Sequence, residues 1–437
     1  MQLLLHAPSI TPRLQYICRF IFKEIMGVEY TITANRYEFK NHKGIKINYA
    51  AGEISGDGFT INSCGLLFEN DIRQQQIVCF KTGNYKAFFK TANADFPFDI
   101  LAASFYLLSR YEEYLPHTKD MYGRYAHENS LAFKQDFLHL PIINTWINNL
   151  AEALQKKFPH FCVQHSAFTF LPTYDIDMAF SYRQKGWWRN MGGFIKRPSL
   201  KRVKVSLGLE NDPFDCYAWL DDLHSRHNLH PLYFFLMAEK NGVYDKNILP
   251  RYKAMQKLIR QHAEKYTIGV HPSWQSGDKP AFLQKEKKLL ESISRSTIIK
   301  SRQHYIRFYL PAGYRLLTEN GITDDYSMGY GSINGFRASV ASSFFWYDLQ
   351  KNTATHLRLH PFCFMEANSF YEQKYTADQA YIELMQYYNI CKKVNGQLIT
   401  IWHNNFLGTD PQFTQWGDIY KKFITQINTS AAPRQNI

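Results

Sequence analysis

Two aspartates, Asp175 and Asp177, stand two residues apart in the stretch FLPTYDIDMAF, residues 170 to 180. The residues before them are largely apolar or β-favouring, and side chains alternate along a strand, so both carboxylates are expected on one side of a strand end. Two carboxylates this close repel each other unless a cation, an arginine or a shared proton compensates them. The pair is therefore either a strand-end cap or a site where one carboxylate binds a divalent metal and the other acts as a base on water.

Further polar residues follow apolar, strand-like runs in the same way. His271 ends the run in IGVHPSW, and His403 ends the run in LITIWHNN. His304 closes another candidate strand, and Arg337, in NGFRAS, is a cation suited to keeping a carboxylate charged. Each signal is weak alone, but several strand-end residues of these types in one chain indicate a single site.

The elements that would position these residues form an alternating pattern from about residue 166. Candidate strands lie at 168–175, 230–238, 266–273, 296–304, 322–328, 357–365 and 397–404. Candidate helices lie at 213–226, 250–262 and 377–391, the last opened by the capping-box pattern Thr376…Gln379. This alternation predicts a parallel sheet, either doubly wound or closed as a barrel. Active-site groups at the C-terminal ends of the strands favour the barrel.

Residues 1–165 predict a separate, smaller α/β domain of unknown role. Strands are expected at 2–7, 29–33, 45–50, 58–68 and 75–80, with a helix over 12–26 and a second between Pro97 and Pro116. No residues in this part have catalytic spacing. The chain is therefore divided into an N-terminal domain (1–165), a barrel domain (166–425) and a flexible tail (426–437).

The composition is that of a folded chain, with 45% hydrophobic and 16% aromatic residues among 437. Its seven cysteines are scattered without a CxxC pair, which is typical of a reducing compartment. The N-terminus lacks signal-peptide features, and no window approaches 18 uninterrupted apolar residues. We therefore expect a soluble, cytoplasmic protein.

The net charge of +13 is concentrated in residues 181–204, which carry eight basic residues and no acidic one. Trp187, Trp188 and Phe194 are interleaved with them. This stretch is a solvated loop, a nucleic-acid groove, or a surface for anionic lipid or a phosphorylated glycan. Because nucleic-acid binding rests on charge alone, we expect no nucleic-acid partner and keep contact with a membrane surface as a hypothesis.

The sequence resembles the polysaccharide deacetylases, carbohydrate esterase family four, over roughly residues 168–405. It is most similar to a bacterial branch with an additional N-terminal domain, through FPFDILAASFYLLSRYEEYLP, SRQHYIRF and DDYSMGY. The resemblance implies a distorted seven-stranded (β/α) barrel and a bound divalent metal, of which zinc is the expected one.

The family's motifs carry over to individual residues. The resemblance implies that Asp175 is the base, held by Arg337, that Asp177 and His271 bind the metal, and that His403 protonates the leaving amine. The family's second ligand histidine is replaced by Gln275, and Ala338 and Ser339 replace its usual proline and aromatic residue. The candidates for the third ligand, with His304 preferred, are Ser273, Gln275, Ser276 and His304. The candidate substrate contacts are Trp274, Trp402 and Tyr326.

The resulting prediction is a metal-dependent hydrolase that removes N-acetyl groups from an amino sugar or polysaccharide precursor. A lipid- or nucleotide-linked glycan suits the expected intracellular location better than an external polymer. Two alternatives stay open. One is an inactive, glycan-binding relative whose metal site has decayed at Gln275, and the other is a deformylase acting on a lipid-linked sugar.

Overall fold

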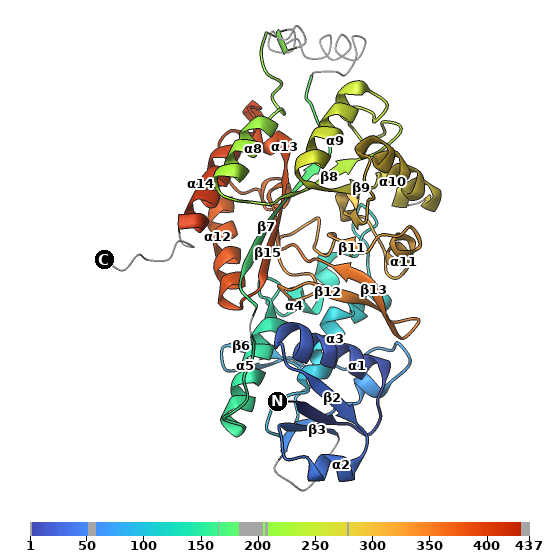
Figure 1. The fold of residues 1–437 in the computed structure, drawn as a ribbon, viewed down its shortest axis with the longest axis vertical. Coiled ribbons are helices and arrows are strands. Elements are labelled where there is room, and N and C mark those ends of the chain that lie inside the picture. The colour runs from blue at the N-terminus through green and yellow to red at the C-terminus, as the bar shows by residue number, and fades with distance from the viewer. Residues whose placement is uncertain are drawn as a thin grey trace, which may run out of the picture.

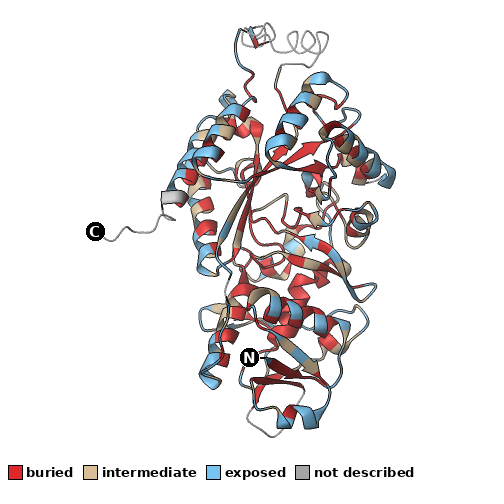
Figure 2. Ribbon diagram, in the orientation of Figure 1, coloured by how far each residue is buried: buried red, intermediate tan, exposed pale blue. Residues whose placement is uncertain are grey.

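A computed structural model describes residues 2–50, 58–164, 166–182, 204–205, 209–277 and 279–429. The chain forms two α/β units, each built on a largely parallel sheet (Figure 1). Most strand residues and the inward faces of the helices are buried, whereas the outer helix faces are exposed (Figure 2). In the part of the chain that is described, no helix combines the length and the apolar character needed to cross a membrane.

The N-terminal unit has a four-stranded parallel sheet in the order β2-β1-β3-β4. Its strands are β1 (Leu3–His6), β2 (Tyr30–Thr33), β3 (Lys46–Ala50) and β4 (Phe59–Asn62), and β5 (Phe80–Thr82) pairs with β6 (Tyr85–Ala87) as a hairpin. The predicted helix over 12–26 is α1 (Pro12–Cys18) followed by π-helical turns Arg19–Ile25. The remaining helices are α2 (Arg36–Asn41), α3 (Ile100–Leu108), α4 (Leu131–Lys134) and α5 (Ile142–Lys157).

Helix α3 lies at the centre of this unit, because all of its residues are buried. The Asp99 side chain caps it by accepting the Ala102 N–H, and Asp99 is itself buried. The predicted helix between Pro97 and Pro116 is therefore confirmed in position. It ends earlier than expected and continues as a 3₁₀ turn, Tyr111–Tyr114.

The second unit has a nine-stranded sheet in the order β12-β13-β11-β10-β9-β8-β7-β15-β14. All neighbouring strands run parallel except β12 and β13. The strands are β7 (Thr169–Ile176), β8 (Leu232–Leu236), β9 (Thr267–His271), β10 (Lys300–Ser301), β11 (Asp324–Asp325), β12 (Phe344–Asp348), β13 (Thr353–Leu359), β14 (Phe364–Met365) and β15 (Gln397–His403). Every predicted strand range from 168 to 404 thus contains a strand.

The differences from the expected barrel lie at the two ends of the strand order. The predicted strand 357–365 is interrupted after Leu359 and forms two strands, β13 and β14, on opposite sides of the sheet order. Strand β12 was not expected and pairs antiparallel with β13. Among the described residues no pairing joins β12 to β14, so a closed seven-stranded barrel is not shown.

Helices follow most of these strands. They are α8 (Tyr217–Arg226), α9 (Lys253–Lys265), α10 (Pro280–Ser294), α11 (Ala312–Glu319), α12 (Ala377–Lys393), α13 (Asn404–Leu407) and α14 (Trp416–Thr429). In Figure 1, α8, α12 and α14 lie to one side of β7 and β15, and α9, α10 and α11 lie to the other. The capping box at Thr376 and Gln379 is confirmed. Helix α14 extends into the predicted tail as far as Thr429.

Buried ionic contacts join the two units. Arg337, in the second unit, forms a two-pronged ion pair with Glu113, with Nη2–Oε2 and Nε–Oε1 distances of 2.6 and 2.9 Å. Arg110 donates to Glu113 as well, at 2.8 Å, and to the Arg337 carbonyl. Burial raises the pKa of Glu113, but the charges of Arg337 and Arg110 outweigh burial and lower that pKa to about 2.

At a second point of contact the N-terminal unit reaches the edge of the nine-stranded sheet. The Tyr16 hydroxyl, on α1, donates a hydrogen bond of 2.7 Å to the carbonyl of Phe345 in β12. The Tyr16 ring also packs against Tyr347 of the same strand, with ring centroids 5.0 Å apart. Strand β12 is thus packed against the N-terminal unit.

The Glu113–Arg337 pair gives the first prediction. Replacing Glu113 by glutamine leaves two buried guanidinium groups under-compensated and should lower the free energy of unfolding by roughly 3–5 kcal/mol. The contribution of the ionised Glu113 to the free energy of unfolding should be fully present above pH 4.5, the ordinary pKa of a glutamate. It should be lost as the pH falls toward about 2, the pKa of Glu113 in the folded protein. Urea denaturation across this pH range measures both effects.

Glu264→Gln, an exposed substitution on α9, is the control and should leave stability nearly unchanged. If Glu113→Gln is as stable as this control at neutral pH, the buried ion pair does not hold the units together as described.

Candidate active site

The two aspartates lie where strand β7 ends. Asp175 is within β7 and only 3% exposed, and Asp177 follows directly after the strand. The register places Asp175 opposite His403 of β15 on one side and Phe234 of β8 on the other. The C-terminal ends of neighbouring parallel strands therefore bring these residues together, as in other parallel α/β sheets.

Asp175 is held by Arg302, a fully buried residue that follows β10. Arg302 Nη1 donates to Asp175 Oδ1 at 2.9 Å and to Thr173 Oγ1 at 2.7 Å. Its Nε donates to the Tyr326 carbonyl at 3.0 Å, and its guanidinium lies 4.5 Å from the centre of the Phe234 ring. These contacts fix the orientation of the Asp175 carboxylate.

The expectation that Arg337 holds Asp175 is wrong. The Arg337 side chain is turned to Glu113 of the N-terminal unit and to the Gly329 carbonyl. Arg302 takes the expected place because β10 lies between β9 and β11 in the sheet, so its end faces the end of β7 across the site.

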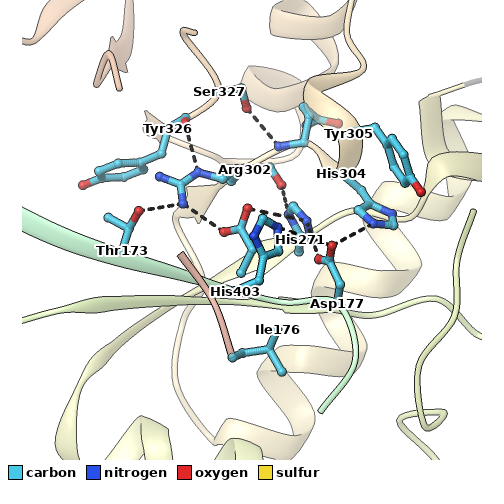
Figure 3. A network of polar contacts seen from close by, with 12 residues as sticks. Thr173, Ile176, Asp177, His271, Arg302, His304, Tyr305, Tyr326, Ser327 and His403 are labelled. Carbon is cyan, nitrogen blue, oxygen red and sulfur yellow. Dashed lines mark hydrogen bonds and ion pairs between the residues drawn. The ribbon is translucent and has the colours of Figure 1, made fainter. Parts of the chain in front are cut away.

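Two histidines, His271 and His304, face Asp177 (Figure 3), and a hydrogen bond holds the Nδ1 atom of each. His271 Nδ1 lies 2.6 Å from the Arg302 carbonyl, which can only accept, so this nitrogen carries the proton. His304 Nδ1 lies 3.0 Å from Asp245 Oδ1, which fixes it in the same way. The Nε2 atoms of His271 and His304 then point to the Asp177 carboxylate, at 3.1 and 3.3 Å.

This donor set fits a divalent cation. Asp177, His271 and His304 each offer a ligand atom, and these atoms lie within 4.8 Å of one another. Asp177 Oδ1 is buried and has no hydrogen-bond partner among the described residues, although an imidazole nitrogen lies close to it. One carboxylate and two imidazoles, each anchored through its second nitrogen, are typical of zinc sites.

Without a cation, the same groups compensate one another by charge. Burial raises the pKa of Asp177, but the charge of His304 and the contacts with His271 and His304 lower it well below its usual range. Burial lowers the pKa of His304, but the carboxylates Asp177 and Asp245 outweigh burial and raise it to about 9. A metal ion and a proton would therefore compete for this position.

The other candidates for a third ligand do not face Asp177. Ser276 donates through its backbone N–H and its hydroxyl to Ser273, and Ser273 in turn donates its N–H to Glu286. The Gln275 side chain contacts Asp245 instead.

His403 completes the group from the end of β15. Its Nδ1 lies 2.6 Å from Glu366 Oε1, and its Nε2 lies 3.6 Å from Asp177 Oδ2. Burial disfavours the imidazolium, but the Glu366 carboxylate and its hydrogen bond outweigh burial and raise the pKa of His403 to about 10. His403 is therefore a protonated imidazole at neutral pH, with Nε2 beside Asp177.

These side chains line a cavity of about 400 Å³. Its wall includes Asp175, Asp177, His271, His304 and His403, together with Tyr122 and Arg124 of the N-terminal unit. A pocket that combines apolar surface with a few convergent polar groups is a plain candidate for a small-molecule site.

The expected substrate contacts lie elsewhere. Trp402 is fully buried against Tyr420, because alternation along β15 turns it to the face opposite His403, so the expectation for Trp402 is wrong. Tyr326 is buried and stacks on His360, with ring centroids 4.3 Å apart, outside the cavity wall. Trp274 stacks on Tyr244 at 4.0 Å and borders Tyr122 and Tyr305, which do line the cavity.

Three residues of this site were not expected from the sequence, namely Arg302, Asp245 and Glu366. Arg302 and Glu366 carried a usable signal, because Arg302 lies within the predicted strand 296–304 and Glu366 directly follows the predicted strand 357–365. Asp245 lies in a loop after β8 with no periodic pattern to mark it. The basic stretch 181–204, the proposed membrane contact, lies almost wholly outside the described residues.

Comparisons with known proteins give limited matches. Residues 3–159 match a family described as "Family of unknown function (DUF7033)". No curated protein matches the sequence. A solved structure described as a "putative polysaccharide deacetylase from Mycobacterium smegmatis" is 13% identical, with a TM-score of 0.40, over 60% of this chain and 84% of that one. The polysaccharide deacetylase Bc1974 from Bacillus cereus is 11% identical, with a TM-score of 0.32, over 59% and 88%.

The His403–Glu366 contact gives the second prediction. In Glu366→Gln the carboxylate that stabilises the imidazolium is gone, whereas burial remains, so the pKa of His403 should fall from about 10 toward its ordinary value or below. An NMR titration of the metal-free protein measures this pKa directly. Glu372→Gln, in the same cavity wall, should leave it nearly unchanged. Equal pKa values in the two variants would contradict the assigned contact.

Proposed function

We propose that this chain is a metal-dependent hydrolase that removes acetyl groups from N-acetylated amino sugars. The observation that carries the proposal is the Asp177 carboxylate, whose Oδ1 and Oδ2 atoms face the Nε2 atoms of His271 and His304, while the Nδ1 atom of each imidazole is held by a hydrogen bond. Asp175 and His403 border this point in the same cavity. The proposed ligands, base and acid therefore line one cavity, as the proposed reaction would need.

The chain's own residues divide the chemistry between them. Asp175, oriented by Arg302, would accept a proton from an attacking water. His403, kept protonated by Glu366, is placed to donate a proton from Nε2 to the departing amine. When bound by Asp177, His271 and His304, a zinc ion or a similar divalent cation would supply Lewis acidity toward the amide carbonyl and acidify water. Acetate and a free amino sugar result.

The electrostatic arrangement supports these separate roles. Asp175 has a permanently charged partner in Arg302, whose Nη1 lies 2.9 Å from Oδ1. His403 has a carboxylate partner on the side away from the cavity, so the imidazolium is favoured. A base and an acid with opposite charge partners are what water attack and amine departure require.

Metal content is the first test. The purified protein should bind about one divalent cation per chain, and Asp177→Ala should lose it because one of three ligands is removed. Asp222→Ala, an exposed change on α8, is the control and should bind the cation like the parent. A parent that stays empty after zinc, cobalt or manganese is added would contradict the hydrolase and favour the glycan-binding alternative.

Catalysis is the second test. Acetate release should be measured with a panel of N-acetylated substrates, both free oligosaccharides and nucleotide-linked sugars. Asp175→Asn and His403→Ala should each lower kcat by roughly 10²–10⁴-fold, as expected for loss of a general base or acid. Both variants should keep their metal, since neither residue is a proposed ligand. Formate release from an N-formyl substrate, without acetate release, would favour the deformylase.

A further inference from the structure

A short hairpin of the N-terminal unit reaches the cavity of the second unit. Lys119 and Tyr125 form an antiparallel bridge at its base. Asp120 organises the tip, because its Oδ1 accepts the backbone N–H groups of Tyr122 and Arg124, both at 2.9 Å. These hydrogen bonds give the Lys119–Tyr125 hairpin a defined shape.

Arg124 fastens this hairpin to the second unit. Its side chain is 6% exposed, with Nε 2.6 Å from Asp120 Oδ2. Its Nη1 donates to the Tyr305 carbonyl at 2.7 Å. Gly331 makes room for this contact, since a Cβ there would lie 2.0 Å from Arg124 Nη1 and 3.0 Å from the Tyr305 carbonyl oxygen.

The anchored carbonyl belongs to an unusual turn. Tyr305 directly follows His304, and both Tyr305 and Ile306 adopt positive φ, 58° and 55°, a region that residues other than glycine rarely occupy. Such a turn persists only where surrounding contacts enforce it. The hydrogen bond from Arg124 is one of these contacts, so the N-terminal unit helps to fix the backbone next to a proposed metal ligand.

Tyr122 lies at the tip of the hairpin and forms part of the cavity wall. Its ring centroid is 5.4 Å from that of Tyr305 and 6.0 Å from those of Trp274 and Tyr244. Its neighbour Met121 is 86% exposed and does not line the cavity. The hairpin therefore presents one aromatic side chain to the space beside His304 and turns the preceding side chain to solvent.

We propose that the Lys119–Tyr125 hairpin is a substrate-binding element, in which Tyr122 contacts the sugar ring and determines specificity. Arg124 is a positioning residue that holds both the hairpin and the turn after His304. An aromatic face suits the apolar C–H surface of a pyranose ring, and the neighbouring rings hold Tyr122 in place. This inference rests on the proposed function, because it places a sugar beside the proposed catalytic groups.

The test compares three variants with the parent in the zinc-loaded, full-length protein, using N,N′,N″,N‴-tetraacetylchitotetraose as the probe. Tyr122→Ala should raise the dissociation constant, measured by calorimetry, and the KM for acetate release about tenfold, equivalent to about 1.4 kcal/mol. Tyr122→Phe keeps the ring and should bind like the parent. Met121→Ala is the matched control on the same hairpin and should also be unchanged.

Arg124→Lys tests the positioning role, because lysine keeps the charge but replaces the rigid pair of donors, Nε to Asp120 and Nη1 to Tyr305, with one nitrogen on a shorter, flexible chain. Its zinc affinity should fall several-fold, since the backbone after His304 is less restrained, whereas Tyr122→Ala should keep the parent's zinc affinity. Unchanged zinc affinity in Arg124→Lys would overturn the positioning role.

The outcomes separate this inference from the proposed function. If the parent releases acetate and Tyr122→Ala has an unchanged KM and dissociation constant, the hairpin proposal is overturned and the hydrolase stands. If the parent binds the probe without releasing acetate, and Tyr122→Ala binds it more weakly, the hairpin proposal is supported and the hydrolase is not. A parent that neither binds the probe nor releases acetate counts against both.

Discussion

The buried guanidinium of Arg302 is the contact on which the rest of the site depends. Its side chain compensates Asp175, and its own backbone carbonyl accepts the Nδ1 proton of His271. Arg302 therefore holds the proposed base, Asp175, through its side chain and the proposed ligand, His271, through its backbone carbonyl. Because Arg302 is fully buried and also bound to Thr173 and the Tyr326 carbonyl, neither group can shift without disturbing several strands.

Most of the second sheet could be predicted from the sequence, because its strands are short apolar runs that end abruptly at polar residues. The capping box at Thr376 and Gln379 was equally readable, since both of its partners are local. The division of residues 357–365 into β13 and β14 could not be predicted from the sequence. The apolar composition of this run is the same whether it forms one strand or two, and only the folded sheet shows that its two parts pair with different strands. Strand β12 was not predicted either, and its antiparallel pairing with β13 is determined by the tertiary structure.

The identities of the candidate site residues were predictable where they followed from strand ends, as for Asp175, His271 and His403. The partner of Asp175 was not, because an arginine's reach depends on which strands are neighbours in space. Both Arg337 and Arg302 follow apolar, strand-like runs in the sequence, yet Arg337 binds Glu113 and Arg302 binds Asp175. The sequence did not predict that Tyr122 and Arg124 of the N-terminal unit line the cavity, because contacts between two units leave no periodic pattern in the sequence.

The contact between Tyr16 and β12 has a consequence for how the two units can exist. Among the described residues, β12 is the outermost strand of its sheet, so the backbone groups on its outer side pair with no described strand. Open strand edges are templates for pairing with other chains, and proteins usually cover or blunt them. The Tyr16 hydroxyl occupies the Phe345 carbonyl in this strand, and α1 packs beside it. The N-terminal unit thus covers part of this edge, and we expect a second unit separated from it by proteolysis to expose strand backbone that can pair with other chains.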